Sequence, residues 1–153
     1  MAELIPAILT RDADEISEKI KFLESIPDVS EAQIDFEDGE FVPNRTTLPQ
    51  DLGHLETRLS LEAHLMVRNP EKYFHQLEEL NFALAIVHFE SFTTTKELVT
   101  AVRNLKALGL KGGVAVNPQT DIEVFDDLIE DIDVCLLMSV FPGFQGKPFL
   151  PES

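Results

Sequence analysis

Gln33 and Asp35 are the side chains of this chain whose types and spacing are best suited to chemistry. They lie two residues apart in a short strand-like segment, so both are expected on the same face of a sheet. The dipeptide Asp38-Gly39 follows as a turn signal and ends the strand abruptly. Asp35 is therefore expected at the carboxyl end of a buried strand, beside a loop, which is where α/β proteins bind their ligands.

Short apolar segments alternate with amphipathic ones along the whole sequence, and the amphipathic ones carry apolar residues at helical spacing. Strand–helix alternation implies right-handed βαβ units and a parallel sheet. The spacing fits an α/β fold of the TIM (β/α)8 barrel type, with about six of the eight strands in this chain. We expect strands over residues 4–9, 32–35, 59–66, 82–89, 114–116 and 134–140, helices over 12–25, 70–80, 96–108 and 121–129, and a helical turn within 48–55.

Composition narrows the possible functions. The chain has 153 residues, of which 44% are hydrophobic, and is predicted to form one domain over residues 1–153. Its formal charge of -16, from 28 acidic and 12 basic residues, argues against nucleic-acid binding and against docking on an anionic membrane. A site for an anionic ligand would have to be built locally, from backbone N–H groups.

Cys135 is the only cysteine, so no disulfide can form within one chain, and a reducing cytoplasm is the expected location. Its apolar neighbours Val134 and Leu136 predict a buried core thiol. The first residues lack the features of a signal peptide, and no segment has the ~20 apolar residues of a membrane span.

Five segments, in order and at matching spacing, resemble the ribulose-phosphate 3-epimerase family. Residues 33–44 resemble its second-strand pattern H-x-D-x-M-D-G-x-F-V-P-N, with Gln33 in place of His and Glu37 in place of Met. Residues 64–67 match its third-strand pattern H-L-M-V without change. The other three are residues 6–10 against P-S-I-L-S, residues 87–90 against the fourth-strand segment, and residues 138–146 against M-S-V-x-P-G-F-x-G. The resemblance implies a TIM barrel that this chain would leave truncated after its sixth strand.

The resemblance also implies an isomerase of the pentose phosphate pathway. Two acids on opposite faces would interconvert D-ribulose 5-phosphate and D-xylulose 5-phosphate through an enediolate, and a divalent cation (Zn, Fe, Mn or Co) would stabilise the oxyanion. Asp35 would be a catalytic acid–base group and a metal ligand, His64 a second ligand, and Gln33 the occupant of a third ligand position. The fourth ligand, which is also the second acid, and the main phosphate loops would belong to the seventh and eighth strands.

The family pattern further implies residues that contact the sugar phosphate. Thr10 keeps the hydroxyl of the family's serine, and the two methionines would line the pocket against the enediolate. The predicted substrate-binding residues are Thr10, His64, Met66, Met138, Gly143 and Gly146. The implied assembly is a cytoplasmic homo-oligomer.

Several of these residues also have an interpretation that involves no metal. Asp35 could end its strand by hydrogen-bonding the following turn, and His64 could be a core histidine. Gln33 is a poor ligand for zinc or iron because a neutral amide oxygen binds them weakly, so it could instead hydrogen-bond substrate or Asp35. Glu37 either points to solvent or repels a phosphorylated substrate.

Three other histidines, His54, His75 and His88, match no ligand position and are assigned no role. The pair Gly112-Gly113 precedes an apolar run and is expected to serve backbone packing. Two functional alternatives stand beside the pentose-phosphate epimerase. One is a catalytically inactive barrel homologue that binds a phosphorylated ligand or a partner, and the other is a ketohexose-phosphate 3-epimerase.

Overall fold

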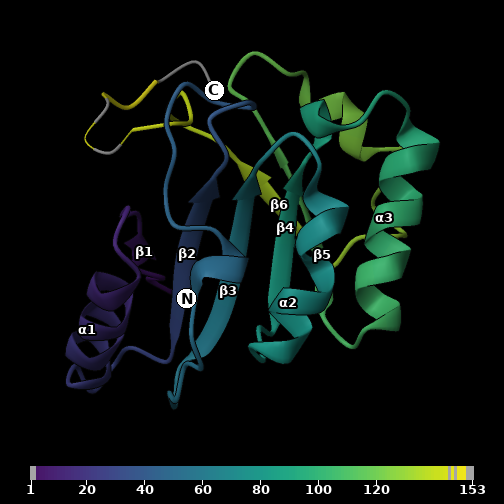
Figure 1. Cartoon of the computed structure of the whole chain (residues 1–153). Coiled ribbons are helices and arrows are strands. Elements are labelled where there is room, and N and C mark those ends of the chain that lie inside the picture. The colour runs from purple at the N-terminus through teal and green to yellow at the C-terminus, as the bar shows by residue number, and fades with distance from the viewer. Residues whose placement is uncertain (1–2, 145, 147, 151–153) are drawn as a thin grey trace.

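The computed structural model describes residues 3–144, 146 and 148–150, which form six parallel strands curled into an open half-barrel (Figure 1). The strands follow one another in the sheet in chain order. This arrangement confirms the predicted α/β class and a partial TIM barrel. The strands are β1 (Ala7–Ile8), β2 (Glu31–Glu37), β3 (Ser60–Met66), β4 (Leu84–His88), β5 (Lys111–Val116) and β6 (Val134–Leu137).

The helices cover the outer, convex side of the sheet (Figure 1). The two longer ones begin at side-chain caps. Asp12 accepts the Asp14 N–H at 2.9 Å at the start of α1, and Thr94 and Glu97 form a reciprocal capping box at the start of α3. The helices are α1 (Ala13–Glu24), α2 (Phe74–Glu79) and α3 (Thr95–Ala107), with 3-10 turns η1 (Pro49–Asp51), η2 (Pro70–Tyr73), η3 (Phe89–Ser91) and η4 (Ile122–Phe125).

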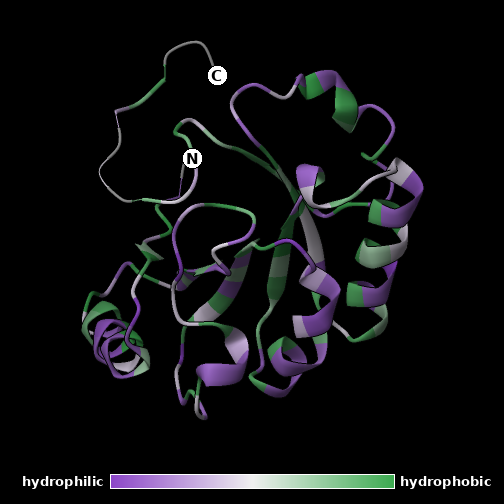
Figure 2. Cartoon of the chain, turned by 45° about the horizontal axis from the view of Figure 1, so that its top comes forward, coloured by the Kyte–Doolittle hydropathy of each residue, from purple (hydrophilic) through white to green (hydrophobic). Residues whose placement is uncertain are grey.

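The sheet has an apolar core on each face, and the two differ in size. The outer core lies between the sheet and the helices and includes Phe36, Leu65 and Leu105, while the helices turn their polar residues outward (Figure 2). The inner core is small, with Leu84, Ile86 and Ala115 as its buried members. Above it, toward the carboxyl ends of the strands, the inner face becomes polar, and this polar end positions the candidate site.

Strand register brings the chemically interesting side chains together. Asp35 on β2 pairs directly with His64 on β3, and His64 pairs with Ile86 on β4. Side chains two residues apart share a face, so His88 lies on the same inner face as His64, one diagonal step away. The carboxyl ends of consecutive strands therefore carry a row of polar groups.

Several predicted elements differ from the structure. The strand expected over 134–140 ends at Leu137, and the helix expected over 70–80 begins with the 3-10 turn η2 before α2. Residues 121–129 were expected to form a helix, but only the 3-10 turn η4 (Ile122–Phe125) forms, followed by turns. Its β-branched residues are weak helix formers, and none of its acidic side chains has a basic partner one turn away within the segment. The strand expected over residues 4–9 is short, because β1 is an outermost strand and pairs only with β2 among the described residues.

The prediction of a buried thiol at Cys135 is wrong. Cys135 is exposed, and its neighbour Leu137 is more than half exposed. Strand β6 is the last strand in the described sheet, where it pairs with β5 alone.

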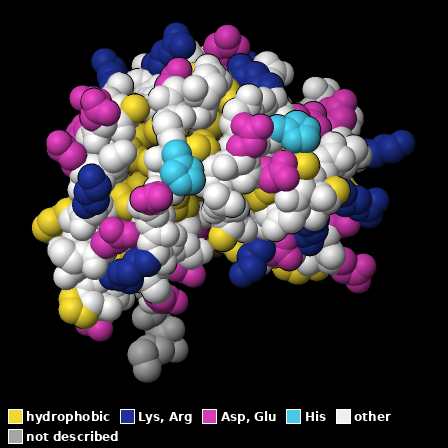
Figure 3. Space-filling model, turned by 60° about the horizontal axis from the view of Figure 1, so that its bottom comes forward, with side chains coloured by type: hydrophobic (Ala, Val, Ile, Leu, Met, Phe, Trp, Pro, Cys, Tyr) yellow, Lys and Arg dark blue, Asp and Glu magenta, His cyan; other side chains and the backbone are white. Residues whose placement is uncertain are grey.

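The amino ends of the strands form the opposite face of the molecule, where acidic and basic side chains surround scattered apolar ones (Figure 3). Within the described part of the chain, every helix is too short or too polar to cross a lipid bilayer.

Candidate active site

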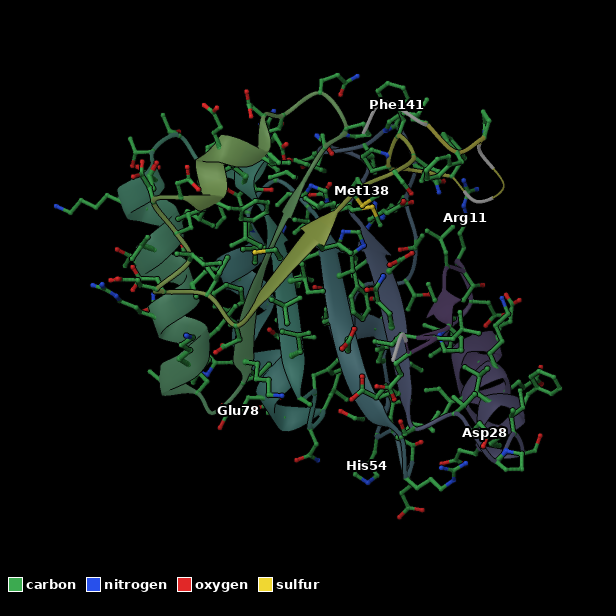
Figure 4. All side chains as sticks on the ribbon, turned by 180° about the vertical axis from the view of Figure 1, so that it is seen from behind. Arg11, Asp28, His54, Glu78, Met138 and Phe141 are labelled. Atoms are coloured by element: carbon green, nitrogen blue, oxygen red, sulfur yellow. The ribbon has the colours of Figure 1, made fainter. Side chains whose placement is uncertain are left out.

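A cavity of about 310 Å³ opens at the carboxyl ends of the strands, between the inner face of the sheet and the chain that follows β6. Figure 4 shows Met138 and Phe141 at this end, whereas His54, Glu78 and Asp28 lie at the other. The size falls in the range typical of small-molecule sites. Its lining includes all but one of the predicted site residues, namely Gln33, Asp35, His64, Met66, Met138, Gly143 and Gly146.

Asp35 is one of the two carboxylates in this lining, with Glu37 the other. Its side chain is 15% exposed, and two neighbours reach the same oxygen. The Gln33 amide Nε2 donates to Asp35 Oδ1 at 2.8 Å, and His64 Nδ1 lies 3.0 Å from that atom. Oδ2 receives no hydrogen bond from the described residues. The structure thus fixes the orientation of Asp35 from one side.

His88, to which the sequence assigned no role, belongs to the same site. Its side chain is 0% exposed, and its Nε2 lies 2.9 Å from Nε2 of His64. Its Nδ1 lies 3.3 Å from Glu90 Oε2, and the ring of Phe41 covers it at a centroid distance of 4.8 Å. The one sequence signal available was the spacing, because residues 64, 86 and 88 lie on one face of neighbouring strands.

Glu90 ends this row of groups in an ionised state. Its Oε1 accepts the Asn117 N–H at 2.8 Å and a short hydrogen bond from the Thr120 hydroxyl. Burial alone would raise the pKa of Glu90, but hydrogen bonds from His88, Thr120 and Asn117 outweigh it and lower the pKa to about 2. Burial lowers the pKa of His88 to about 4, and the hydrogen bond to Glu90 offsets this only in part. At neutral pH the row therefore contains a neutral His88 beside a charged Glu90.

Glu37 lines the cavity but does not point to solvent, so that alternative is wrong. It is the last residue of β2 and is 0% exposed. The Asn44 Nδ2 donates to Glu37 Oε2 at 2.6 Å, and Arg11 Nη2 donates to Asn44 Oδ1 at 2.6 Å. The loop after β2 is thus fastened to the cavity wall through Asn44.

The predicted phosphate contacts fall at the rim. Gly143 and Gly146 line the cavity with φ of 113° and 73°, conformations that side chains other than glycine rarely adopt. Thr10 lies outside the cavity lining, and its hydroxyl donates to Glu15 in a short hydrogen bond. A role for Thr10 in substrate binding stays a prediction.

Two of the three predicted metal ligands, Asp35 and His64, have side chains that suit a divalent cation. Asp35 Oδ1 and His64 Nδ1 lie 3.0 Å apart, and an anionic oxygen beside an imidazole nitrogen is a ligand pair that suits zinc or a related metal. Gln33 turns its amide N–H, which cannot bind a metal, toward Asp35. Among the described residues, no group of three or more His, Cys, Asp or Glu side chains is arranged to hold a metal ion.

Comparison with known proteins agrees with this geometry. The model of the Ribulose-phosphate 3 epimerase family matches residues 3–153. The chain belongs to this family. It is 36% identical to the ribulose-phosphate 3-epimerase of Aquifex aeolicus over 100% of this chain and 68% of that protein. It is 33% identical to that of Bacillus subtilis, over 98% of this chain and 68% of the relative.

The chloroplastic ribulose-5-phosphate-3-epimerase of Arabidopsis thaliana is 33% identical over 95% of this chain and 52% of that protein. The chain therefore spans between about half and two thirds of the length of these relatives. Ribulose-phosphate 3-epimerases are isomerases, so the family is one of enzymes.

Proposed function

We propose that this protein interconverts D-ribulose 5-phosphate and D-xylulose 5-phosphate, with Asp35 as one of the two acid–base groups. The proposal is supported by the family match over residues 3–153 and by Asp35 lining the cavity, within the segment that resembles the family's second-strand pattern. Because Gln33 Nε2 and His64 Nδ1 both lie against Oδ1, Oδ2 is the atom that would take the proton from carbon 3. A catalytic base has to reach the proton it removes, and Asp35 lines the cavity in which the sugar would bind.

The other cavity residues have roles that follow from their chemistry. Met66 and Met138 present apolar walls that keep water from the enediolate. The backbone at Gly143 and Gly146 would hold the phosphate at the rim. A divalent cation held by Asp35 and His64 would supply Lewis-acid stabilisation of the developing oxyanion. The acid on the opposite face of the sugar would come from the seventh strand of the family barrel.

The first half of the reaction can be tested by itself. When D-ribulose 5-phosphate is incubated with the protein in heavy water, deuterium should enter carbon 3, as followed by proton NMR. Asp35→Asn should slow this exchange by about 10²–10⁴-fold, because the amide cannot accept the proton. Asp28→Asn is the matched control, since Asp28 is exposed at the far end of the barrel (Figure 4). Exchange that survives in Asp35→Asn would assign the base to another residue.

The same measurement separates the alternatives. Tight binding of D-ribulose 5-phosphate without exchange in the wild-type protein would support an inactive binding homologue. Faster exchange with a ketohexose phosphate would support the hexose enzyme.

A further inference from the structure

We propose that a second cavity, between the segments that follow β1 and β2, binds a small phosphate monoester. Its volume is about 460 Å³, and it is lined by Arg11, Ala13, Arg45, Thr46, Thr47 and Asp51. Among the described residues, this lining shares no member with that of the catalytic cavity. Figure 4 shows Arg11 at the same end of the sheet as Met138 and Phe141, but over α1. This second site does not depend on the function proposed for Asp35.

The two segments that form this cavity are held in place by backbone contacts. The Thr47 N–H donates to the Thr10 carbonyl at 3.0 Å, which joins the segment after β2 to the segment after β1. Arg45 pairs with Asp38, the residue after β2, in an isolated antiparallel bridge. The cavity is therefore built on backbone that is fixed at the carboxyl ends of the strands.

Arg11 supplies a positive charge whose position is fixed. Its Nη2 donates to Asn44 Oδ1 at 2.6 Å, and Asn44 Nδ2 donates in turn to the buried carboxylate of Glu37 at 2.6 Å. Asn44 takes one of the five N–H groups of the guanidinium, so the others remain for a ligand. A side chain that is already ordered loses less conformational entropy when a ligand binds.

Arg45 adds a second positive charge to the same cavity. It is exposed, and it forms no ion pair with a described residue. Two guanidinium groups suit a phosphate, because each planar group can donate two N–H bonds to two phosphate oxygens. The two arginines therefore form a local exception to the acidic character of the chain, whose formal charge is -16.

Thr47 adds a hydroxyl whose hydrogen bonding is incomplete. It lines the cavity and is 5% exposed, and its Oγ1 has no hydrogen-bond partner among the described residues. Buried hydroxyl groups in proteins are usually hydrogen-bonded, and a phosphate oxygen is a strong acceptor. The neighbouring Thr46 is already engaged, because its hydroxyl accepts the Glu37 N–H at 2.9 Å and donates to the Asp35 carbonyl at 3.1 Å.

Negative charges beside the cavity oppose an anion, and their contacts show how much. Asp51 belongs to the lining, but its Oδ2 accepts the Leu48 N–H at 3.1 Å, which ties the carboxylate to the turn η1. Asp12 caps α1, so the positive end of that helix already has a negative partner. The attraction for an anion therefore comes from the two arginines rather than from the helix.

The size of the cavity and the charge of the chain define the ligand class. A volume of about 460 Å³ is typical of sites for small molecules and accommodates more than a phosphate group alone. The formal charge of -16 opposes a nucleic acid or an anionic membrane. A phosphate carried on a small polar molecule fits both observations.

Titration with glycerol 3-phosphate, followed by proton–nitrogen correlation NMR, tests the site. The Nε–H signals of Arg11 and Arg45 and the amide signal of Thr47 should shift and saturate together. Inorganic phosphate should cause the same shifts at higher concentration, and glycerol should cause none. Shifts confined to the amides of Gly143 and Gly146 would place the anion in the catalytic cavity and overturn the proposal. The absence of any saturable shift, or saturation by inorganic phosphate alone, would also overturn it.

Charge variants show which side chains hold the anion. Arg45→Gln should weaken binding of glycerol 3-phosphate by about 10–100-fold, because charge-assisted hydrogen bonds are lost. Arg103→Gln is the matched control, since it removes the same charge from an exposed position on α3, away from α1 (Figure 1), and should change the affinity less than about 2-fold. Asp51→Asn keeps an acceptor for the Leu48 N–H and should strengthen binding by about 2–5-fold. Equal weakening by Arg45→Gln and Arg103→Gln would refute a specific site.

The two sites can be separated in the same proteins. Arg45→Gln should leave the heavy-water exchange at carbon 3 unchanged, and Asp35→Asn should leave the shift of the Thr47 amide unchanged. If the wild-type protein shows no exchange, the proposed function fails, but the titration still decides the second site. Loss of the Thr47 shift in a folded Asp35→Asn protein would mean that both measurements report one site, and would overturn the proposal.

Discussion

Lowering the pH from 7 to 5 should destabilise this protein through His88. The pKa of His88 is about 4 in the folded chain because of burial, against an ordinary value of 6.5. Between those values the unfolded chain binds a proton that the folded chain does not, so the free energy of unfolding falls as the pH falls. One pKa unit corresponds to about 1.4 kcal/mol, which gives about 3 kcal/mol over the whole interval and about 2 kcal/mol between pH 7 and 5.

Urea unfolding followed by far-ultraviolet circular dichroism at pH 7 and pH 5 measures this loss. For each protein, the measured quantity is the difference between its free energies of unfolding at pH 7 and at pH 5. A change in overall stability caused by a substitution therefore cancels. His88→Gln should reduce the difference between the two pH values by about 2 kcal/mol, because the amide does not titrate. His75→Gln should leave the difference as in the wild type, since the His75 side chain is largely exposed.

Glu90 does not obscure the result, because it titrates in another range. Its pKa is lowered to about 2 from 4.5, so its contribution to stability is complete above the unfolded value and is lost as the pH falls toward 2. The reasoning is refuted if His88→Gln and the wild type lose the same stability between pH 7 and 5.

Two further outcomes follow from packing and exposure. Gly112→Ala should lower the free energy of unfolding by about 1–3 kcal/mol, because the added Cβ would lie 2.7 Å from Val102 Cγ1. Urea unfolding should show that Val102→Ala in the same protein relieves part of this loss, whereas Gly53→Ala, with open space around it, costs little. Strictly additive effects of the Gly112 and Val102 changes would exclude this contact. Cys135 should react with a maleimide in the native protein at a rate slowed by its raised pKa, as mass spectrometry would show, and labelling only in denaturant would contradict its exposure.

The juxtaposition of Asp35 and His64 could be predicted from the sequence. Both residues lie at or near the carboxyl ends of predicted strands, over 32–35 and 59–66, and the carboxyl ends of parallel strands meet at one edge of the sheet. Their direct pairing in the β2–β3 register agrees with that prediction. The roles assigned to the individual site residues, including metal binding by Asp35, His64 and Gln33, stay predictions.

The part played by His88 could not be predicted in the same way. Motif comparison assigns roles position by position, and His88 matched no ligand. Its contact with His64 depends on the diagonal placement of the two residues on the neighbouring strands β3 and β4, and on the rotamers of the two rings. A hydrophobic pattern in the sequence encodes neither. The burial of Glu37 has a similar origin, because its partner Asn44 returns to it from a loop seven residues away.

The error at Cys135 has a different cause. An apolar run such as 134–138 is typical of a strand buried on both faces, but burial also depends on what packs against each face. For an outermost strand that neighbour comes from another part of the fold. Local sequence therefore predicted the strand but not the exposure of its side chains.

The chain order of the strands in the sheet has a consequence for biosynthesis. Each strand from β2 to β6 pairs with the strand that is synthesised immediately before it. Among the described residues, no strand needs a later strand to pair with its amino-terminal neighbour. The paired residues are 21–29 positions apart in the chain, because each strand is joined to its predecessor by a single connection. This order lets the sheet grow one unit at a time as the polypeptide emerges from the ribosome at ~5–20 residues per second. The Asp35–His64 pair would then be in place after β3, before the chain that follows β6 has been synthesised.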